Sequence, residues 1–280
     1  MRDVRSHPRR DRTLLAAALV LASIVLLVIA GPLLSPYAVD EIDFAGVWGA
    51  APGLAAAHWF GTDDLGRDLF VRICDGGRLS LLVGLAASSV SLFIGVAWGA
   101  IAGYFGGLID AVMMRIVDIL YAMPFLFFAI LLTVLFGRHI VLIFAAIGAI
   151  NWLDMARIVR GQTLSLKRRE FVEAAIVSGS GPLHIVFAHI VPNLLGVIVV
   201  YLTLTIPQAI LIESFLSFLG LGVQEPHTSW GALVSNGAQA MEATPWALIL
   251  PAGFLAVTLL CLNFIGDGLR DALDVRGVRR

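Results

Sequence analysis

The sequence predicts an all-α fold, a polytopic membrane helical bundle with six transmembrane helices. Hydrophobic residues make up 59% of the chain and charged residues only 14%, a composition far from that of a soluble domain. Six apolar stretches approach or exceed the length of about 20 residues with which a helix crosses a bilayer. None alternates with the period of two that the strands of a membrane barrel require, so the spans are expected to be helices.

The apolar stretches and the polar segments between them organise the chain. We expect transmembrane helices at 14–34, 80–104, 117–136, 140–156, 194–218 and 246–265. The other expected parts are an N-terminal tail at 1–13, a loop at 35–79, a five-helix core at 80–268 that contains a polar loop at 157–193, and a C-terminal tail at 269–280.

The basic residues predict the orientation of the bundle. They gather in both tails and in the loop at 157–193, whereas the loop at 35–79 is rich in acids. Cytoplasmic segments of membrane proteins carry the excess of Lys and Arg. We therefore expect a multi-pass protein with both termini and the 157–193 loop in the cytoplasm, and with the 35–79 loop on the extracytoplasmic side. The net charge of −1 gives no indication of nucleic-acid binding.

The second stretch has a face of small residues at intervals of three or four. Its members are Gly84, Ser88, Ser91, Gly95, Gly99 and Gly103. In lipid, helices associate where small residues let two backbones approach closely. We expect this face to pack against another helix, either in the same chain or in a second subunit.

The fifth stretch contains an acid, Glu213, close to two serines, Ser214 and Ser217. An ionisable residue inside a bilayer is a functional-site hypothesis by default. Glu213 and Ser217 are therefore candidate wall residues of a translocation path. Pro207 and the run Leu219-Gly220-Leu221-Gly222 permit a hinge or a static bend in the same helix.

Two aspartates in other spans have simpler interpretations. Asp118 lies one helical turn from Arg115, and Asp154 lies three residues before Arg157. At this spacing an acid and a base on one helix can pair. We expect these two local ion pairs.

The polar loop at 157–193 predicts two short helices joined by a glycine. A first helix is expected at 166–178, with Phe171, Ala174, Ala175 and Ser178 on one face. Gly179 then suits a helix end that requires positive φ. A second helix is expected from Pro182, striped by Leu183, Val186, Phe187 and Ile190. Such an elbow suits docking into a groove of another protein, although periodicity alone fits an amphipathic element on lipid headgroups equally well.

Catalytic and cofactor motifs are missing from the sequence. It has no Gly-x-x-x-x-Gly-Lys-Ser/Thr phosphate loop, no zinc-protease spacing and no Gly-x-Ser-x-Gly elbow. The acids at 63–68 lack the spacing of a calcium loop and predict a capped turn before a helix. Cys74 and Cys261 lie in different parts of the chain, so we expect no disulfide between them. The expectation is a protein without enzymatic activity, without cofactor and without metal.

The loop resembles a known family motif. It contains Glu173-Ala174-Ala175, then Gly179, and then Pro192 thirteen residues further on. This pattern resembles the EAA loop of binding-protein-dependent ABC importer permeases. The resemblance implies the type I ABC importer permease fold, and it implies that Glu173, Ala174, Ala175 and Gly179 contact an ATPase subunit, with Pro192 closing the motif.

Three further segments extend the resemblance over nearly the whole chain. They are His58 to Asp68 with Gly77 to Leu81, Glu213 to Gly222 with Trp230-Gly231, and Gly266 to Asp274. They are similar to the dipeptide/oligopeptide/nickel branch, and most similar to its C-type permease subunit. One departure is Ser214-Phe215, where the family more often has smaller residues after the glutamate.

The resemblance implies partners and a location. We expect a bacterial inner-membrane importer with a second, non-identical permease, two cytoplasmic ATP-binding subunits and an extracytoplasmic solute-binding protein that delivers a peptide. Nickel or another small solute is an alternative cargo within the same branch. A proton-driven secondary transporter using Glu213 or Asp118 is the rival class. An intramembrane enzyme is a third class, for which the sequence offers no nucleophile and base at usable spacing.

Overall fold

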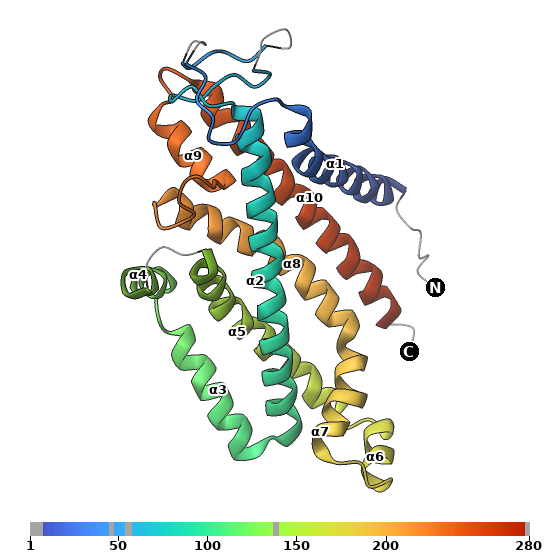
Figure 1. Cartoon of the computed structure of the whole chain (residues 1–280). Helices are drawn as coiled ribbons and strands as arrows, with labels where there is room; N and C mark the ends of the chain where they lie inside the picture. The colour runs from blue at the N-terminus through green and yellow to red at the C-terminus, as the bar shows by residue number, and fades with distance from the viewer. Residues whose placement is uncertain (1–7, 45–47, 54–57, 137–139, 278–280) are drawn as a thin grey trace.

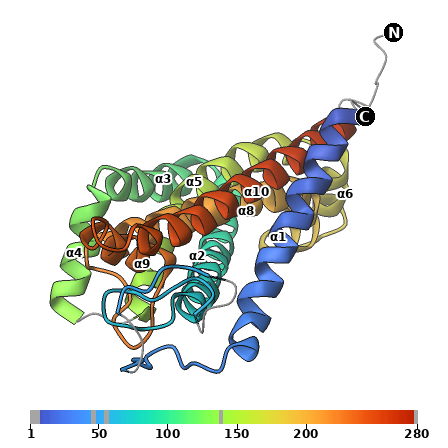
Figure 2. The same cartoon turned by 90° about the horizontal axis from the view of Figure 1, so that it is seen from above.

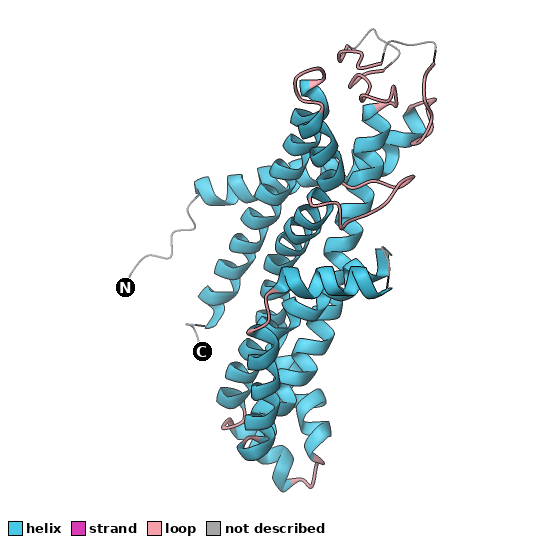
Figure 3. Cartoon of the chain, turned by 90° about the vertical axis from the view of Figure 1, so that its left-hand side faces the viewer, coloured by secondary structure: helices cyan, strands magenta, loops and turns pink. Residues whose placement is uncertain are grey.

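The computed structural model describes residues 8–44, 48–53, 58–136 and 140–277, and the regular elements in these ranges are helical (Figures 1 and 3). The parts of the two expected tails at 1–7 and 278–280 lie outside the described residues. The helices are α1 (Pro8–Leu34), α2 (Leu69–Phe105), α3 (Gly107–Tyr121), α4 (Phe125–Phe136), α5 (Ile140–Leu166), α6 (Glu170–Val177), α7 (Pro182–His184), a π-helical segment η1 (Ile185–Ile190), α8 (Val191–Phe218), α9 (Trp230–Gln239) and α10 (Pro245–Gly277). The prediction of an all-α membrane helical bundle is confirmed.

Helix α2 runs through the length of the bundle (Figure 1). It packs against α5 and α8, and α10 packs against α8 and α9. Helix α1 lies at the edge of the bundle, where it contacts α10 and α2 (Figure 2). The loop before α2 and helix α9 lie at one end of the bundle, whereas α6 and α7 lie at the other end (Figure 1). We call these the loop end and the elbow end.

Four helices are long and apolar enough to cross a membrane in the part of the chain that the structure describes. They run over Arg12–Leu34, Leu69–Phe105, Pro182–Phe218 and Pro245–Leu273. These correspond to the first, second, fifth and sixth expected spans. The count of six remains a prediction.

The third expected span is two helices instead of one. Helix α3 begins at Gly107 and ends at Tyr121, and α4 begins at Phe125. The break falls at Pro124, which lacks a backbone N–H and pushes the preceding residue out of the helical region. After the break α4 turns away from the direction of α3 (Figure 2), so the prediction of one continuous helix over 117–136 is wrong.

Other helices are longer than their apolar stretches. Helix α2 begins at Leu69 because the Asp68 side chain accepts a hydrogen bond from the Val71 N–H at 2.8 Å. This confirms the capped turn expected at 63–68. Helix α5 continues past its apolar part to Leu166, and α10 continues to Gly277, into the segment expected as a tail.

The small-residue face of α2 packs within the same chain. A Cβ added to Gly95 would stand 2.6 Å from the Met155 Cβ, and one added to Gly103 would stand 2.8 Å from the Thr163 Cβ. At Gly99 it would overlap the main chain of α5. The contact expected for this face is therefore confirmed, with α5 as its main partner.

Candidate functional site: the elbow and the buried glutamate

The elbow is the segment from Glu170 to Gly181, and it is shorter than the sequence predicted. Helix α5 ends at Leu166 and α6 begins at Glu170, so the expected helix at 166–178 covers the end of one helix and the whole of another. Two acids, Glu170 and Glu173, lie in the first turn of α6. Carboxylates stabilise this end of a helix through its dipole.

Gly179 ends α6 with the positive φ that the sequence predicted, at +79°. Its N–H donates to the Ile176 carbonyl at 3.0 Å, and the Ser180 N–H donates to the Ala175 carbonyl at 3.1 Å. This pair of bonds is a Schellman motif, which usually places glycine at the left-handed position. A Cβ at Gly179 would meet nothing within 4 Å, so glycine is required here by the backbone alone.

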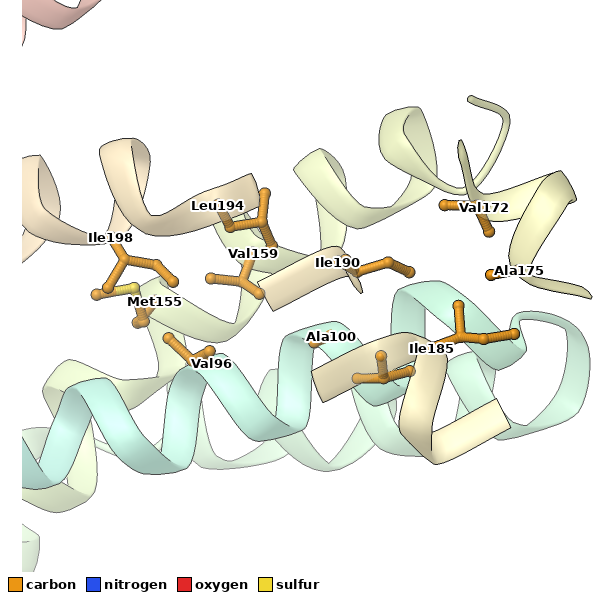
Figure 4. Close-up of a cluster of buried hydrophobic side chains, with 11 residues drawn as sticks. Val96, Ala100, Met155, Val159, Val172, Ala175, Ile185, Ile190, Leu194 and Ile198 are labelled. Carbon is orange, nitrogen blue, oxygen red and sulfur yellow. The ribbon is translucent and has the colours of Figure 1, made fainter. Parts of the chain in front are cut away.

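One face of α6 anchors the elbow in the hydrophobic core. Val172 and Ala175 are buried in a cluster with α2, α5, η1 and α8 (Figure 4). The other members of the cluster are Val96, Ala100, Met155, Val159, Ile185, Val186, Ile190, Leu194 and Ile198. The elbow is therefore fixed to the bundle, and Ala175 faces inward at 7% exposure.

The opposite face of the elbow is exposed and carries more apolar surface than the sequence indicated. Glu173, Ala174 and Gly179 are exposed. Near them Val177 is 88% exposed and Ile176 is 53% exposed. Neither residue belongs to the face that the sequence predicted, which consists of Phe171, Ala174, Ala175 and Ser178. Within that predicted face, Ala175 is buried. Large apolar side chains left open together indicate a protein or membrane contact.

The helix after the elbow, which the sequence predicted as a second short helix, is continuous with the fifth span. From Pro182 to Phe218 the backbone remains helical, and η1 is a π-helical segment within it. The Val191 N–H donates to the Val186 carbonyl, five residues back. This wider turn lies just before Pro192, whose ring and missing N–H disturb an ordinary α-helix. Pro192 thus lies inside a helix that joins the elbow to the membrane part.

Glu213 is fully buried and surrounded by hydroxyl groups. Ser217 donates to its Oε1 at 2.7 Å, and Ser80 of α2 donates to its Oε2 at 3.1 Å. Ser214 also donates to Oε2 at 3.4 Å. The Trp230 N–H of α9 in turn donates to the Ser80 oxygen at 3.2 Å. Glu213 therefore joins α2, α8 and α9 through hydrogen bonds, a contact that the sequence did not predict.

The two candidate path residues have different surroundings. Glu213 has no exposed surface. Ser217 lies on the wall of a hollow of about 470 Å³ at the loop end, which Phe218, Gln224 and Thr228 also line. Of the two, only Ser217 lines this hollow.

The aspartates of the other spans form ion pairs between helices. Arg157 of α5 donates to Asp118 of α3 at 2.8 Å, so the expected pairing of Asp118 with Arg115 is wrong. Arg160 of α5 also binds both carboxylate oxygens of Asp110 in α3, at 2.5 and 2.6 Å. The pairs connect α3 to α5 because Arg157 reaches across to the neighbouring helix, and its expected pairing with Asp154 is not formed.

No group of three His, Cys, Asp or Glu side chains suited to a metal ion occurs among the described residues. Cys74 and Cys261 are free thiols, as expected.

Comparison with known proteins places the chain in a family. Residues 95–278 match the family described as binding-protein-dependent transport system inner membrane component. The chain is 58% identical to the oligopeptide transport system permease protein OppC of Escherichia coli (strain K12), over 97% of this chain and 90% of that protein. It is 44% identical to the OppC protein of Bacillus subtilis (strain 168), over 98% and 88% of the two chains. It is 43% identical to the dipeptide transport system permease protein DppC of the same organism, over 97% and 84%.

The matched region of the family contains both the elbow and the buried Glu213, and the relatives align with nearly the entire chain. This chain therefore belongs to the family of inner membrane components of binding-protein-dependent transport systems.

Proposed function

We propose that this protein is a permease subunit of an ATP-driven importer, and that it forms half of a translocation path for peptides. The observation that carries the proposal is the elbow, where an exposed face with Glu173, Ala174 and Val177 is backed by a buried face on the bundle. The relatives are oligopeptide and dipeptide permeases by name, and peptides are the corresponding cargo here. Nickel and other small solutes are the alternative cargo.

The elbow would transmit force between subunits. An ATPase that binds the exposed face of α6 would move α6 together with the bundle, because α6 packs against η1 and because Val172 and Ala175 belong to a buried cluster that includes side chains of α2 and α5. The same movement would reach the path through the helix from Pro182 to Phe218. Energy from ATP would enter through this protein contact, and this subunit would itself be non-catalytic.

The full assembly would contain four kinds of component besides this chain. These are a second, non-identical permease, two cytoplasmic ATP-binding subunits, an extracytoplasmic solute-binding protein and the peptide. The elbow would lie in the cytoplasm together with both termini, because the basic residues of the chain gather there. The exposed apolar faces of α1 and α10 would meet lipid or the second permease.

Uptake by reconstituted vesicles tests the proposal. The complete transporter, with the ATPase subunits and ATP inside the vesicles, is given radiolabelled trialanine and the purified binding protein outside. We expect uptake that requires ATP and continues when a protonophore removes the proton gradient. Uptake without ATP that the protonophore stops would instead establish the proton-driven class.

A further inference from the structure

Two hollows meet at the loop end of the bundle. One has a volume of about 470 Å³ and the other about 280 Å³. Three side chains, Glu225, Asn236 and Gln239, line both of them. Glu225 belongs to the segment that connects α8 to α9, so a movement of this segment changes the wall between the two hollows.

The larger hollow is lined by groups that can donate and accept hydrogen bonds. They include Ser217, Gln224, Thr228, Ser235, Asn236 and Gln239. Amides and hydroxyls of this kind match the N–H and C=O groups of a peptide main chain. The volume is also within the range of pockets for small ligands, roughly 300 to 1,000 Å³.

Two arginines hold the Glu225 carboxylate at the edge of these hollows. Arg67 Nη1 donates to Oε1 of Glu225 at 2.6 Å, and Arg72 Nη2 lies 3.5 Å from the same oxygen. The arginine side chains are 7% and 1% exposed, whereas the Glu225 side chain is 59% exposed. The hydrogen bond from Arg67 lowers the pKa of Glu225. A solvent-facing anion is thus bound to two buried cations.

Arg72 retains unused capacity to donate. Among the described residues its Nε has no hydrogen-bond partner, and the nearest acid oxygen, Asp63 Oδ2, is 3.6 Å away. The Nη2 of the same guanidinium is only at the limit of hydrogen-bond distance from Glu225 Oε1, at 3.5 Å, so Arg72 can donate to a closer carboxylate oxygen on the side that lines the larger hollow. Two arginines side by side can bind a second carboxylate oxygen in the bidentate manner that guanidinium groups prefer.

We propose that Arg67 and Arg72 form a binding site for the C-terminal carboxylate of a peptide, and that Glu225 is a built-in carboxylate that the peptide displaces. The peptide main chain then lies in the larger hollow, along Asn236 and Gln239. This inference rests on the proposed function, because it assigns a part of the path to the peptide. The displaced Glu225 takes the connecting segment with it.

The test compares trialanine with trialanine amide, which lacks the terminal charge. Equilibrium binding of each radiolabelled peptide is measured on the complete permease and ATPase complex in nanodiscs, without the binding protein. In Glu225→Gln the internal competitor loses its charge. We expect trialanine to bind about ten-fold more tightly, because a charge-assisted hydrogen bond has been freed, and we expect binding of the amide to be unchanged.

Three further variants make the result decisive. Glu225→Asp keeps the charge and should bind both peptides as the unaltered complex does. Glu242→Gln removes another exposed carboxylate, one that lines neither hollow, and should change nothing. Arg67→Gln should weaken binding of trialanine and leave the amide unchanged.

Equal changes in the affinity of both peptides in Glu225→Gln, or no change for either, would overturn the inference. A purely structural role of Glu225 would not distinguish a peptide carboxylate from a peptide amide. Uptake of trialanine by the same complex with binding protein and ATP tests the proposed function separately. If trialanine is taken up but Glu225→Gln changes the binding of both peptides equally, only the proposed carboxylate site is refuted. If trialanine is not taken up, the proposed function is refuted.

Discussion

The Ser80 hydroxyl of α2 donates a hydrogen bond of 3.1 Å to the Glu213 carboxylate of α8, although 133 positions separate the two residues. The same Ser80 oxygen accepts the N–H of Trp230 at the start of α9. Three helices therefore share one buried carboxylate. This arrangement gives Glu213 a structural role that does not require it to carry protons.

Replacing Glu213 separates that role from proton transport. Glu213→Ala should lower the free energy of unfolding of the purified protein in detergent by about 1 to 3 kcal/mol, because the Ser80 and Ser217 hydroxyls lose their acceptor in a buried site. Glu213→Gln keeps one acceptor oxygen and should retain ATP-driven uptake. If the Gln variant is as stable as the original protein and yet takes up no peptide, Glu213 has a direct role in transport.

The backbone at Gly179 predicts a graded series. Gly179→Pro removes the N–H that bonds Ile176 and cannot adopt φ of +79°, so uptake should be lost while the protein still inserts. Gly179→Ala should cost about 1 kcal/mol from backbone strain alone. Gly181→Ala is the matched control, because Gly181 has φ of −67° and open space around it. Normal uptake by Gly179→Pro would refute the role of the elbow in coupling.

The exposed face of α6 predicts the ATPase contact. Glu173→Ala and Val177→Asp should each reduce the amount of ATPase subunit that co-purifies with the permease, because both side chains are exposed. Glu170→Ala is the control, since it removes an exposed acid from the same helical turn. The ratio of subunits on a stained gel provides the measurement. Undiminished ATPase retention by both variants would show that the contact lies elsewhere.

Close packing of α2 on α5 predicts a steric effect at one glycine. Gly99→Ala places a methyl group against the Ala156 carbonyl and 2.9 Å from the Arg160 nitrogen, and overpacking of this kind costs about 1 to 3 kcal/mol. Gly161→Ala, on α5 with nothing within 4 Å, should be neutral. Thermal unfolding in detergent compares the two variants. Equal melting temperatures would mean that the helices separate easily at this point.

His58 predicts a pH dependence of stability in the loop before α2. Burial lowers the pKa of His58, but hydrogen bonds to Asp68 at 2.8 Å and to Asp43 at 3.2 Å outweigh this and raise it above 6.5. A raised pKa means that the folded loop binds the proton more tightly than the unfolded chain.

The stability from His58 should therefore be complete below about pH 6.5 and be lost as the pH rises through the folded-state pKa. His58→Gln should remove this component of the pH profile of thermal unfolding. A profile that is identical in the variant would assign the pH dependence to other groups.

The sequence allowed the bundle, the positive φ of Gly179 and the packing face of α2 to be predicted, because each has a local signal. Apolar length marks the spans, a glycine after a helical pattern marks its end, and small residues at helical spacing mark a close contact. The start of α2 had a weaker signal, since Arg72 interrupts the apolar pattern. The charge of Arg72 is compensated by two acids, Asp63 and Glu225. Of these, Glu225 lies far from Arg72 in the sequence.

The surroundings of Glu213 could not be predicted, because Ser80 and Trp230 come from two other helices. The inward direction of Ala175 likewise depends on other helices, chiefly η1, against which α6 packs. The break at Pro124 did have a signal, which the high hydropathy of the stretch obscured. Contacts between distant segments, and not local propensity, account for most of what sequence reasoning missed.

Helix α2 has 37 residues, and at 1.5 Å per residue it is about 55 Å long. The hydrocarbon core of a bilayer is only about 30 Å thick. Even at a tilt of about 40°, a helix of this length spans more than the hydrocarbon core, so part of it must lie outside that core. The first turns of α2, where Arg72 lies close to Asp63 of the preceding loop, belong to the loop end of the bundle. A single helix therefore connects the glycine contacts with α5 to the loop end of the bundle.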